Sequence, residues 1–131
     1  MQQLQCCCGH ARASSQHEWW RTWETLEQGA IRELKEETGL TPKAFYSADI
    51  NEQFYEADRD SLTVAPVFVA FAETGAEVVL NEEHSDYRWL EFNSAIELVT
   101  FGGQRRILQW IEDEFVKRAP SDFLRIAFDA N

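Results

Sequence analysis

Three glutamates within five positions form the part of the chain best suited to chemistry. Residues 32–40 read Arg-Glu-Leu-Lys-Glu-Glu-Thr-Gly-Leu. On a helix, which turns about 100° per residue, Glu33, Glu36 and Glu37 would fall within an arc of roughly 100°. Like charges at this spacing repel one another, so a cation among them would relieve the repulsion. Ligands that are all oxygen favour a hard ion, and the cluster therefore predicts a site for Mg²⁺ or Mn²⁺.

A helix that would position these acids is expected from about Thr25 to Thr38. Thr25 followed three residues later by Gln28 has the form of a capping box, and Gly39 stands where a left-handed C-terminal cap is needed. The next roughly 100° of this helix would carry an apolar stripe that faces the core. The stripe consists of Ala30, Ile31 and Leu34.

The spacing around this helix resembles the Nudix box of nucleoside-diphosphate-linked hydrolases. That pattern is Gly, five residues, Glu, seven residues, Arg-Glu-aliphatic, any residue, Glu-Glu, any residue, Gly-aliphatic. The chain matches it from Glu24 to Leu40 and departs from it at Glu18, which stands in place of the first glycine. This resemblance covers the predicted helix and its two flanks.

The resemblance implies roles for the residues of the box. Glu33, Glu36 and Glu37 would hold a divalent metal on a substrate diphosphate. Arg32 would contact these acids, rather than the metal, and orient them. The plain structural alternative is an exposed acidic helix stabilised by pairing of Arg32 with Glu36.

A second stretch also resembles this family. Residues 83–90 (Glu-His-Ser-Asp-Tyr-Arg-Trp-Leu) followed by Phe-Gly-Gly-Gln-Arg at 101–105 are similar to the downstream half of Nudix nucleoside triphosphate pyrophosphohydrolases, including the dihydroneopterin triphosphate branch. The resemblance implies that Glu83 adds a further carboxylate to the metal site. His84 is interpreted as a structural hydrogen-bonding residue.

Substrate-binding residues are expected near the start of the last long helix. Gly103 and Gln104 would stand at a helix N-terminus, which can receive an anion or a polar edge. Aromatic side chains could stack on a purine or pterin, although most of them are expected in the core. The candidates are Phe54, Tyr55, Trp89 and Phe101.

Composition bounds the function. The 131 residues suit one domain, with residues 1–17 as an atypical N-terminal segment. A net charge of −11 argues against binding to a nucleic acid polymer or an anionic membrane. The longest apolar stretch, Leu62 to Ala72, is too short to span a bilayer, and no signal peptide opens the chain, so a cytoplasmic location is expected. The consecutive Cys6, Cys7 and Cys8 suggest neither a disulfide nor a zinc site.

The remaining pattern indicates an α/β or α+β chain. Strands are predicted around Ala44 to Ile50, at Phe54 and Tyr55, over Leu62 to Ala72, over Val78 to Leu80 and over Arg88 to Phe92. Pro66 suggests a bulge or a sheet edge. Asn93 would cap a helix over Ser94 to Leu98, and a longer helix would run from Gly103 to Arg118 before Pro120. Its stripe would be Ile107, Leu108, Ile111 and Phe115. The segment from Asp122 to Phe128 would add a strand or pack on the surface.

The family resemblance implies an α/β/α sandwich with a mixed sheet. Such a domain places strands and a glycine-rich loop before its box, and residues 1–16 show no convincing alternation, so N-terminal strands should be missing. A reading-frame error is one explanation, because the codon TGG of Trp19, Trp20 and Trp23 read one nucleotide later encodes glycine. A divergent or truncated protein is the other.

The family resemblance, together with the acid cluster, implies metal-dependent hydrolysis of a nucleoside or pterin triphosphate to a monophosphate and pyrophosphate. One of the glutamates of the box or Glu83 would act as the base, and the sequence does not choose among them. Two alternatives stay open: a catalytically silent or binding protein, favoured by the missing glycine loop, and an ADP-ribose or nucleoside diphosphate sugar hydrolase. The oligomeric state is not indicated.

Overall fold

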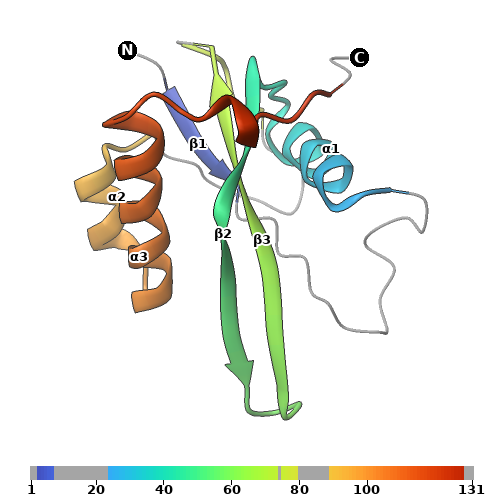
Figure 1. The fold of residues 1–131 in the computed structure, drawn as a ribbon, viewed down its shortest axis with the longest axis vertical. Coiled ribbons are helices and arrows are strands. Elements are labelled where there is room, and N and C mark those ends of the chain that lie inside the picture. The colour runs from blue at the N-terminus through green and yellow to red at the C-terminus, as the bar shows by residue number, and fades with distance from the viewer. Residues whose placement is uncertain (1–2, 8–23, 74, 80–88, 129–131) are drawn as a thin grey trace.

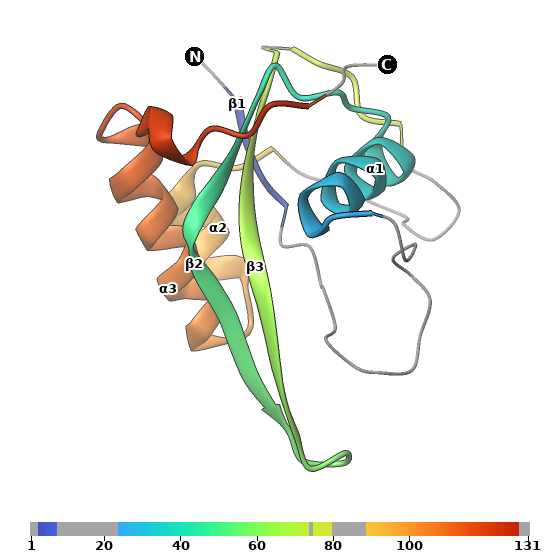
Figure 2. The same cartoon turned by 45° about the vertical axis from the view of Figure 1, so that its right-hand side comes forward.

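A three-stranded sheet with helices on both of its faces forms the described part of the chain (Figure 1). The computed structural model describes residues 3–7, 24–73, 75–79 and 89–128. The strands are β1 (Gln3–Cys7), β2 (Ala44–Glu56) and β3 (Ser61–Ala72), and the helices are α1 (Leu26–Thr38), α2 (Phe92–Leu98) and α3 (Gly102–Ile111). The sheet order is β1-β3-β2. Helix α1 covers one face, whereas α2 and α3 lie on the other (Figure 2).

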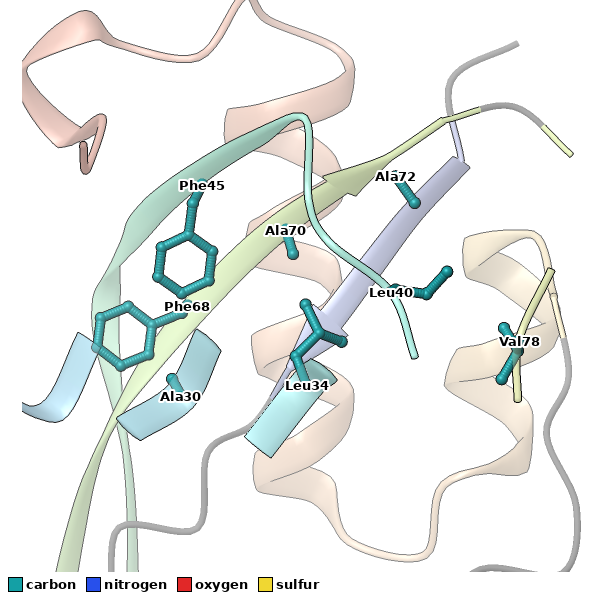
Figure 3. Close-up of a cluster of buried hydrophobic side chains, with 8 residues drawn as sticks. All are labelled: Ala30, Leu34, Leu40, Phe45, Phe68, Ala70, Ala72 and Val78. Atoms are coloured by element: carbon teal, nitrogen blue, oxygen red, sulfur yellow. The ribbon is translucent and has the colours of Figure 1, made fainter. Parts of the chain in front are cut away.

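The alternation of residues along β2 and β3 builds a core on each face, because successive side chains of a strand point to opposite sides. On the α1 face, Phe45 and Phe68 stack with ring centroids 5.4 Å apart and pack with Ala30 and Leu34 of α1 (Figure 3). On the α3 face, the buried residues are Tyr46, Ala48, Val67, Val69, Phe71, Ile107, Ile111 and Phe115. The expected α/β/α layering is confirmed.

All pairings between the described strands are antiparallel. The mixed character expected of the sheet is therefore not seen among these residues. Strand β3 matches the prediction over Leu62 to Ala72 and begins one residue earlier. Pro66 lies opposite Asn51, where the β2–β3 register shifts, and β1 pairs β3 only from Phe68 onward. The missing N–H of Pro66 thus falls beside a bulge, as proline in a sheet requires.

Strand β2 runs without a break where two short strands were predicted. The irregularity between Ser47 and Asn51 that interrupts the apolar alternation is a bulge, in which Asp49 adopts a positive φ of 59°. A bulge inserts residues without ending the pairing, so the strand continues to Glu56. The prediction of two separate strands was wrong for this reason.

Residues 1–16 supply one short strand, β1, although their sequence shows no convincing alternation of apolar and polar residues. Backbone pairing joins Gln3 to Ala72 and Cys7 to Phe68, which makes β3 the central strand. The partner of β1 is the most deeply buried part of β3, and its backbone groups need hydrogen bonds whatever the side chains of the pairing segment are. An amphipathic pattern in residues 3–7 was therefore not required.

Two boundaries near α2 differ from the predictions. Trp89 and Leu90 are not in a strand, Phe92 already belongs to α2, and Glu91 rather than Asn93 is the N-cap. The helix begins early because half-buried Phe92 packs against the core of the α3 face. Arg88 and Leu80 lie outside the described residues, and Val78 and Val79 are not in a strand.

The last long helix is confirmed, with a change of pitch at its end. Helix α3 is followed directly by a π-helical turn over Glu112–Val116, so the helical stretch reaches nearly as far as predicted. Trp110 ties α3 to the sheet, since its Nε1 donates to the carbonyl oxygen of Ala48 at 2.8 Å. After a 3₁₀ turn over Asp122–Leu124, the chain adds a single bridge between Arg125 and Tyr46.

Candidate metal and phosphate site

Both ends of α1 are fixed in the way that the sequence predicts. Thr25 Oγ1 accepts from the backbone N–H of Gln28 at 3.3 Å, and Gln28 Oε1 accepts from the N–H of Thr25 at 3.0 Å. At the other end, Gly39 has a φ of 72° and donates its N–H to the Lys35 carbonyl at 2.8 Å. The capping box and the glycine cap are therefore confirmed, and the helix that carries the acids has defined limits.

The rotation of α1 about its axis is set by its apolar stripe. Ala30 and Leu34 are buried at 6% and 3% exposure, and Ile31 packs against them. Because Glu33 and Glu37 follow on the adjoining flank, they are half-buried, whereas Glu36 is exposed. The acids thus lie beside the core-facing stripe, as the helical spacing predicts.

Arg32 joins the start of the box to the acid face. Its Nε lies 3.2 and 2.9 Å from the two carboxylate oxygens of Glu24, and its second nitrogen, Nη1, donates to Glu36 Oε2 at 3.0 Å. The Glu24 side chain is only 11% exposed and that of Arg32 is 25% exposed, so this pair is partly shielded from solvent. Hydrogen bonding to Glu24 raises the pKa of Arg32. The guanidinium consequently orients two carboxylates at once.

Glu33 is electrostatically unfavourable as a lone anion. Burial is the main cause that raises the pKa of its carboxyl above the ordinary value, and the neighbouring Glu37 is the next, with a smaller contribution from Glu36. Arg32 acts in the opposite direction. A bound cation would remove both the desolvation cost and the mutual repulsion.

The carboxylate oxygens of Glu33, Glu36 and Glu37 are the kind of ligand that a hard divalent ion prefers, and all three lie along one side of α1. Among the described residues, however, no three His, Cys, Asp or Glu side chains are gathered closely enough to hold a metal ion. Glu83 and His84 lie outside the described residues. The described carboxylates therefore provide oxygen ligands on one helix, and closer convergence would require a change of their rotamers.

The predicted substrate residues gather in a pocket of their own. A pocket of about 780 Å³, here called the β2–α3 pocket, lies between the outer half of β2 and the start of α3. Its lining includes Phe54, Tyr55, Phe101, Gly103 and Gln104. Trp89, the remaining aromatic candidate, packs against the core of the α1 face instead. The structure brings together five of the residues that sequence reasoning had proposed for the organic half of a substrate.

The acid flank and the β2–α3 pocket lie on different faces of the sheet. Helix α1 packs on Phe45 and Phe68, whereas Ile107, which lines the pocket, packs with Val67 and Val69 on the opposite side. A second pocket of about 530 Å³ beside α1 is lined in part by Arg32 and Glu36 but not by Glu33 or Glu37. The described residues thus do not form one continuous cavity that joins the acids to the aromatic residues.

Three residues of these sites were not singled out from the sequence. Glu24 matched a position of the family pattern, but its pairing with Arg32 was not predicted. The two residues are eight positions apart, whereas side chains that pair on a helix are three or four apart. Glu52 and Arg106 line the β2–α3 pocket. Glu52 could have been found only by joining the two short predicted strands into one, which places it on the same face as Phe54.

Comparison with known proteins supports the interpretation of the acidic helix. The model of the NUDIX domain matches residues 20–111, which cover α1, both long strands, α2 and α3. A search of curated proteins finds no match. Among the described residues, no helix has the length and apolar character needed to cross a membrane.

Proposed function

The chain belongs to the Nudix family, and we propose that it is a metal-dependent pyrophosphohydrolase of nucleoside or pterin triphosphates. Nudix domains in general are hydrolases of nucleoside diphosphate derivatives. The proposed reaction is attack of water on a phosphorus of the triphosphate, with release of pyrophosphate and a monophosphate. The proposed cofactor is Mg²⁺ or Mn²⁺, and the substrate is a small molecule rather than a nucleic acid polymer.

The carboxylates of α1 carry the proposal. Glu33, Glu36 and Glu37 supply the oxygen ligands, and Glu83 is proposed as a further one from its place in the sequence. When bound, the divalent ion supplies neutralisation of the phosphate charge and a more acidic water. The acids themselves are negative and would repel a triphosphate, which is why ion binding and substrate binding are expected to depend on each other.

Arg32 is proposed as a positioning residue rather than a ligand to phosphate. Its contacts to Glu24 and Glu36 would hold a metal-binding carboxylate in a fixed orientation without touching the metal. A base must also accept a proton from the attacking water. One of the glutamates of the box, or Glu83, is proposed to accept this proton.

The single observation that supports this function most is the raised pKa of Glu33 on a helix whose ends and rotation are fixed. A solvated acidic helix would spread its charges over exposed positions. Here, two of the three acids are half-buried beside the core, where their repulsion is costly unless a cation offsets it.

Two other functions remain candidates. A silent binding protein is favoured by the absence of a glycine at position 18 and by the lack of convergence of the carboxylates. A hydrolase of ADP-ribose or of nucleoside diphosphate sugars would use the same acids on a different substrate.

The decisive experiment measures product release from a panel of triphosphates, dinucleotides and ADP-ribose, with and without Mg²⁺ or Mn²⁺. We expect pyrophosphate from triphosphates in the presence of metal and none after chelation. AMP from ADP-ribose with no pyrophosphate from triphosphates would establish the diphosphate-sugar function instead. A folded protein with no turnover and no metal uptake by calorimetry would overturn the enzymatic proposal.

A further inference from the structure

The β2–α3 pocket runs along the edge of a strand rather than over a face of the sheet. Its lining includes every residue of β2 from Ile50 to Tyr55. Neighbouring side chains of a strand point to opposite faces, so an unbroken run of lining residues means that the pocket borders the main chain at the strand edge. Among the described strands β2 is at one end of the sheet order, and α3 forms the opposite wall of the pocket (Figure 1, Figure 2).

The main chain of β2 along this pocket has unused hydrogen-bonding groups. In an antiparallel pair, every second residue of a strand directs its N–H and C=O away from the partner strand. Within the described part of the chain, the main chain from Asn51 to Tyr55 is engaged only by the pairing with β3. The groups that point away from β3 are therefore available to a further strand.

The inner part of the same edge is already engaged. The C-terminal segment forms a bridge from Arg125 to Tyr46, so an extended segment of this chain pairs with that end of β2. Trp110 of α3 then donates to the carbonyl oxygen of Ala48 at 2.8 Å. The pocket begins beyond these contacts. The open edge from Asn51 to Tyr55 spans roughly 17 Å, since a strand rises about 3.4 Å per residue.

The outer half of the β2–β3 hairpin has two strands among the described residues. Strand β1 pairs with β3 only over Phe68 to Ala72, whereas β2 and β3 stay paired as far as Glu56 and Ser61. A two-stranded hairpin is marginally stable in water, and it gains stability from a third strand. Aromatic side chains remain open on this half, with Phe54 37% and Tyr55 62% exposed. A strand added along β2 would cover part of this surface.

The side chains beside the open edge determine which strand fits. Val67 is buried on the α3 face, and residues two apart on β3 share a face, so Ala65 lies there too. Its partner Glu52 therefore points to the α3 side, as does Phe54 two positions further on. Among the described residues, no hydrogen bond or ion pair engages the Glu52 carboxylate. A fitting strand carries a basic side chain opposite Glu52 and an apolar one opposite Phe54.

The charge of the chain also favours a basic partner. Strand β2 contains Asp49, Glu52 and Glu56 and no lysine or arginine. The whole chain has a net charge of −11. An acidic segment would meet like charges along the strand, whereas a basic segment is attracted to it.

Helix α3 supplies donors on the far side of the pocket. Gln104 accepts from the N–H of Phe101 through Oε1 at 3.4 Å, and its Nε2 group donates no hydrogen bond within the described residues. Arg106 also lines the pocket and forms no ion pair with a described residue. Both groups can donate to carbonyl oxygens on the outer edge of an added strand. Because α3 closes this side, the pocket accepts one extended chain, whereas a second copy of this protein would bring its own α3 against the first.

We propose that the β2–α3 pocket is a docking site for an extended segment of another protein, which adds a strand to the open edge of β2. The segment carries a basic residue opposite Glu52 and an apolar residue two positions away opposite Phe54. Main-chain pairing provides the affinity, and these two side chains provide the specificity. This interaction is separate from the proposed hydrolysis, because α1 packs on the opposite face of the sheet.

The test uses a synthetic peptide, acetyl-Thr-Thr-Lys-Thr-Val-Thr-Thr-amide, whose capped ends carry no charge. Calorimetric titration of the full chain should show binding, and the amides from Asn51 to Tyr55 should become protected from hydrogen exchange. A peptide with glutamate in place of the lysine should bind about tenfold more weakly, because a like charge then faces Glu52. A peptide N-methylated at the lysine, the central threonine and the valine should not bind, since it lacks the N–H groups that pair with β2.

Two protein variants separate a specific contact from general charge attraction. Glu52→Gln should lose most of the difference between the lysine and glutamate peptides. The matched control Glu97→Gln removes the same charge from an exposed position on α2 and should keep the difference. A difference that persists in folded Glu52→Gln protein would overturn the role of Glu52.

Three other outcomes would overturn the docking proposal itself. The first is no binding of the lysine peptide by either measurement, and the second is equal binding of the N-methylated peptide. The third is protection of Asn51 to Tyr55 in the chain alone that rises with protein concentration, together with a dimer in sedimentation. That result would assign the edge to a second copy.

Discussion

Helices α1 and α3 each pack an apolar stripe on one face of the same sheet, yet their N-termini are built differently. Helix α1 begins with a reciprocal side-chain cap and ends at a left-handed glycine. Helix α3 begins with two glycines, and its cap is one hydrogen bond of 3.4 Å from the N–H of Phe101 to Oε1 of Gln104. The comparison indicates that α1 is built to hold charge in a fixed place, whereas the start of α3 leaves room for a ligand.

The largest difference between the two helices should appear in turnover. Glu37→Gln on α1 is expected to lower the rate of pyrophosphate release by several orders of magnitude, because a proposed metal ligand becomes a neutral amide. The free energy of unfolding should change little, since the variant removes one charge from a repulsive group. Glu27→Gln on the same helix is the control, and unchanged activity of Glu37→Gln would refute the assigned metal role.

A change at the start of α3 should instead affect peptide binding. Phe101→Ala is expected to weaken binding of the lysine peptide about fivefold, because an apolar side chain that lines the β2–α3 pocket is lost. Phe123→Ala is the control, since Phe123 is fully exposed and lies outside the pocket. Calorimetric titration measures both affinities, and equal weakening in the two variants would contradict a binding role for the start of α3.

Substitution of a glycine should affect stability differently at the end of α1 and at the start of α3. Gly39→Ala should lower the free energy of unfolding by about 1 kcal/mol, because its φ of 72° disfavours a side chain. No atom within 4 Å opposes a Cβ at Gly103, so Gly103→Ala should leave stability equal or raise it by about 0.5 kcal/mol. Denaturant titration of the two variants measures the contrast, which would fail if Gly103→Ala proved the more damaging.

The smallest effect concerns pH. The pKa of Glu33 is raised in the folded state, so its contribution to stability is fully present below pH 4.5 and is lost as the pH rises through the folded value. Glu33→Gln should therefore be more stable than the wild type at about pH 7 by roughly a few tenths of a kcal/mol, since the site is partly exposed. At about pH 4 the two should be equal. A variant less stable than the wild type at both pH values would contradict this.

Sequence reasoning located α1 almost to the residue, because its signals are local. The capping pair Thr25 and Gln28, the stripe residue Leu34 and the terminal Gly39 all act within a few positions. The position of Glu33 and Glu37 beside the core could be predicted because it follows from their spacing to Leu34 on the same helix. The lack of convergence of the described acids on one point could not be predicted, because it depends on side-chain rotamers and on residues outside the helix.

Features set by distant contacts were missed. The β2 bulge hid one long strand, and with it the face that Glu52 shares with Phe54. The strand β1 has no strong pattern, and its pairing depends on the backbone groups of β3 that β2 does not engage. The pairing of Arg32 with Glu24 joins residues on either side of a cap. In each case the determining partner is far along the chain or outside any regular repeat. A single domain over residues 1–131 stays a prediction.

The Arg32 guanidinium contacts Glu24 and Glu36 through different nitrogens, and this affects how an ion would bind. If the Glu36 carboxylate swings toward an incoming ion, Nη1 of Arg32 gives up that contact, but Nε still holds Glu24 in a shielded position. The arginine thus has an anchor that does not take part in the exchange, and little reorganisation energy is required of it. Loss of that anchor in Glu24→Ala should therefore slow ion capture, which stopped-flow measurement of Mn²⁺ binding to the variant and the wild type would detect.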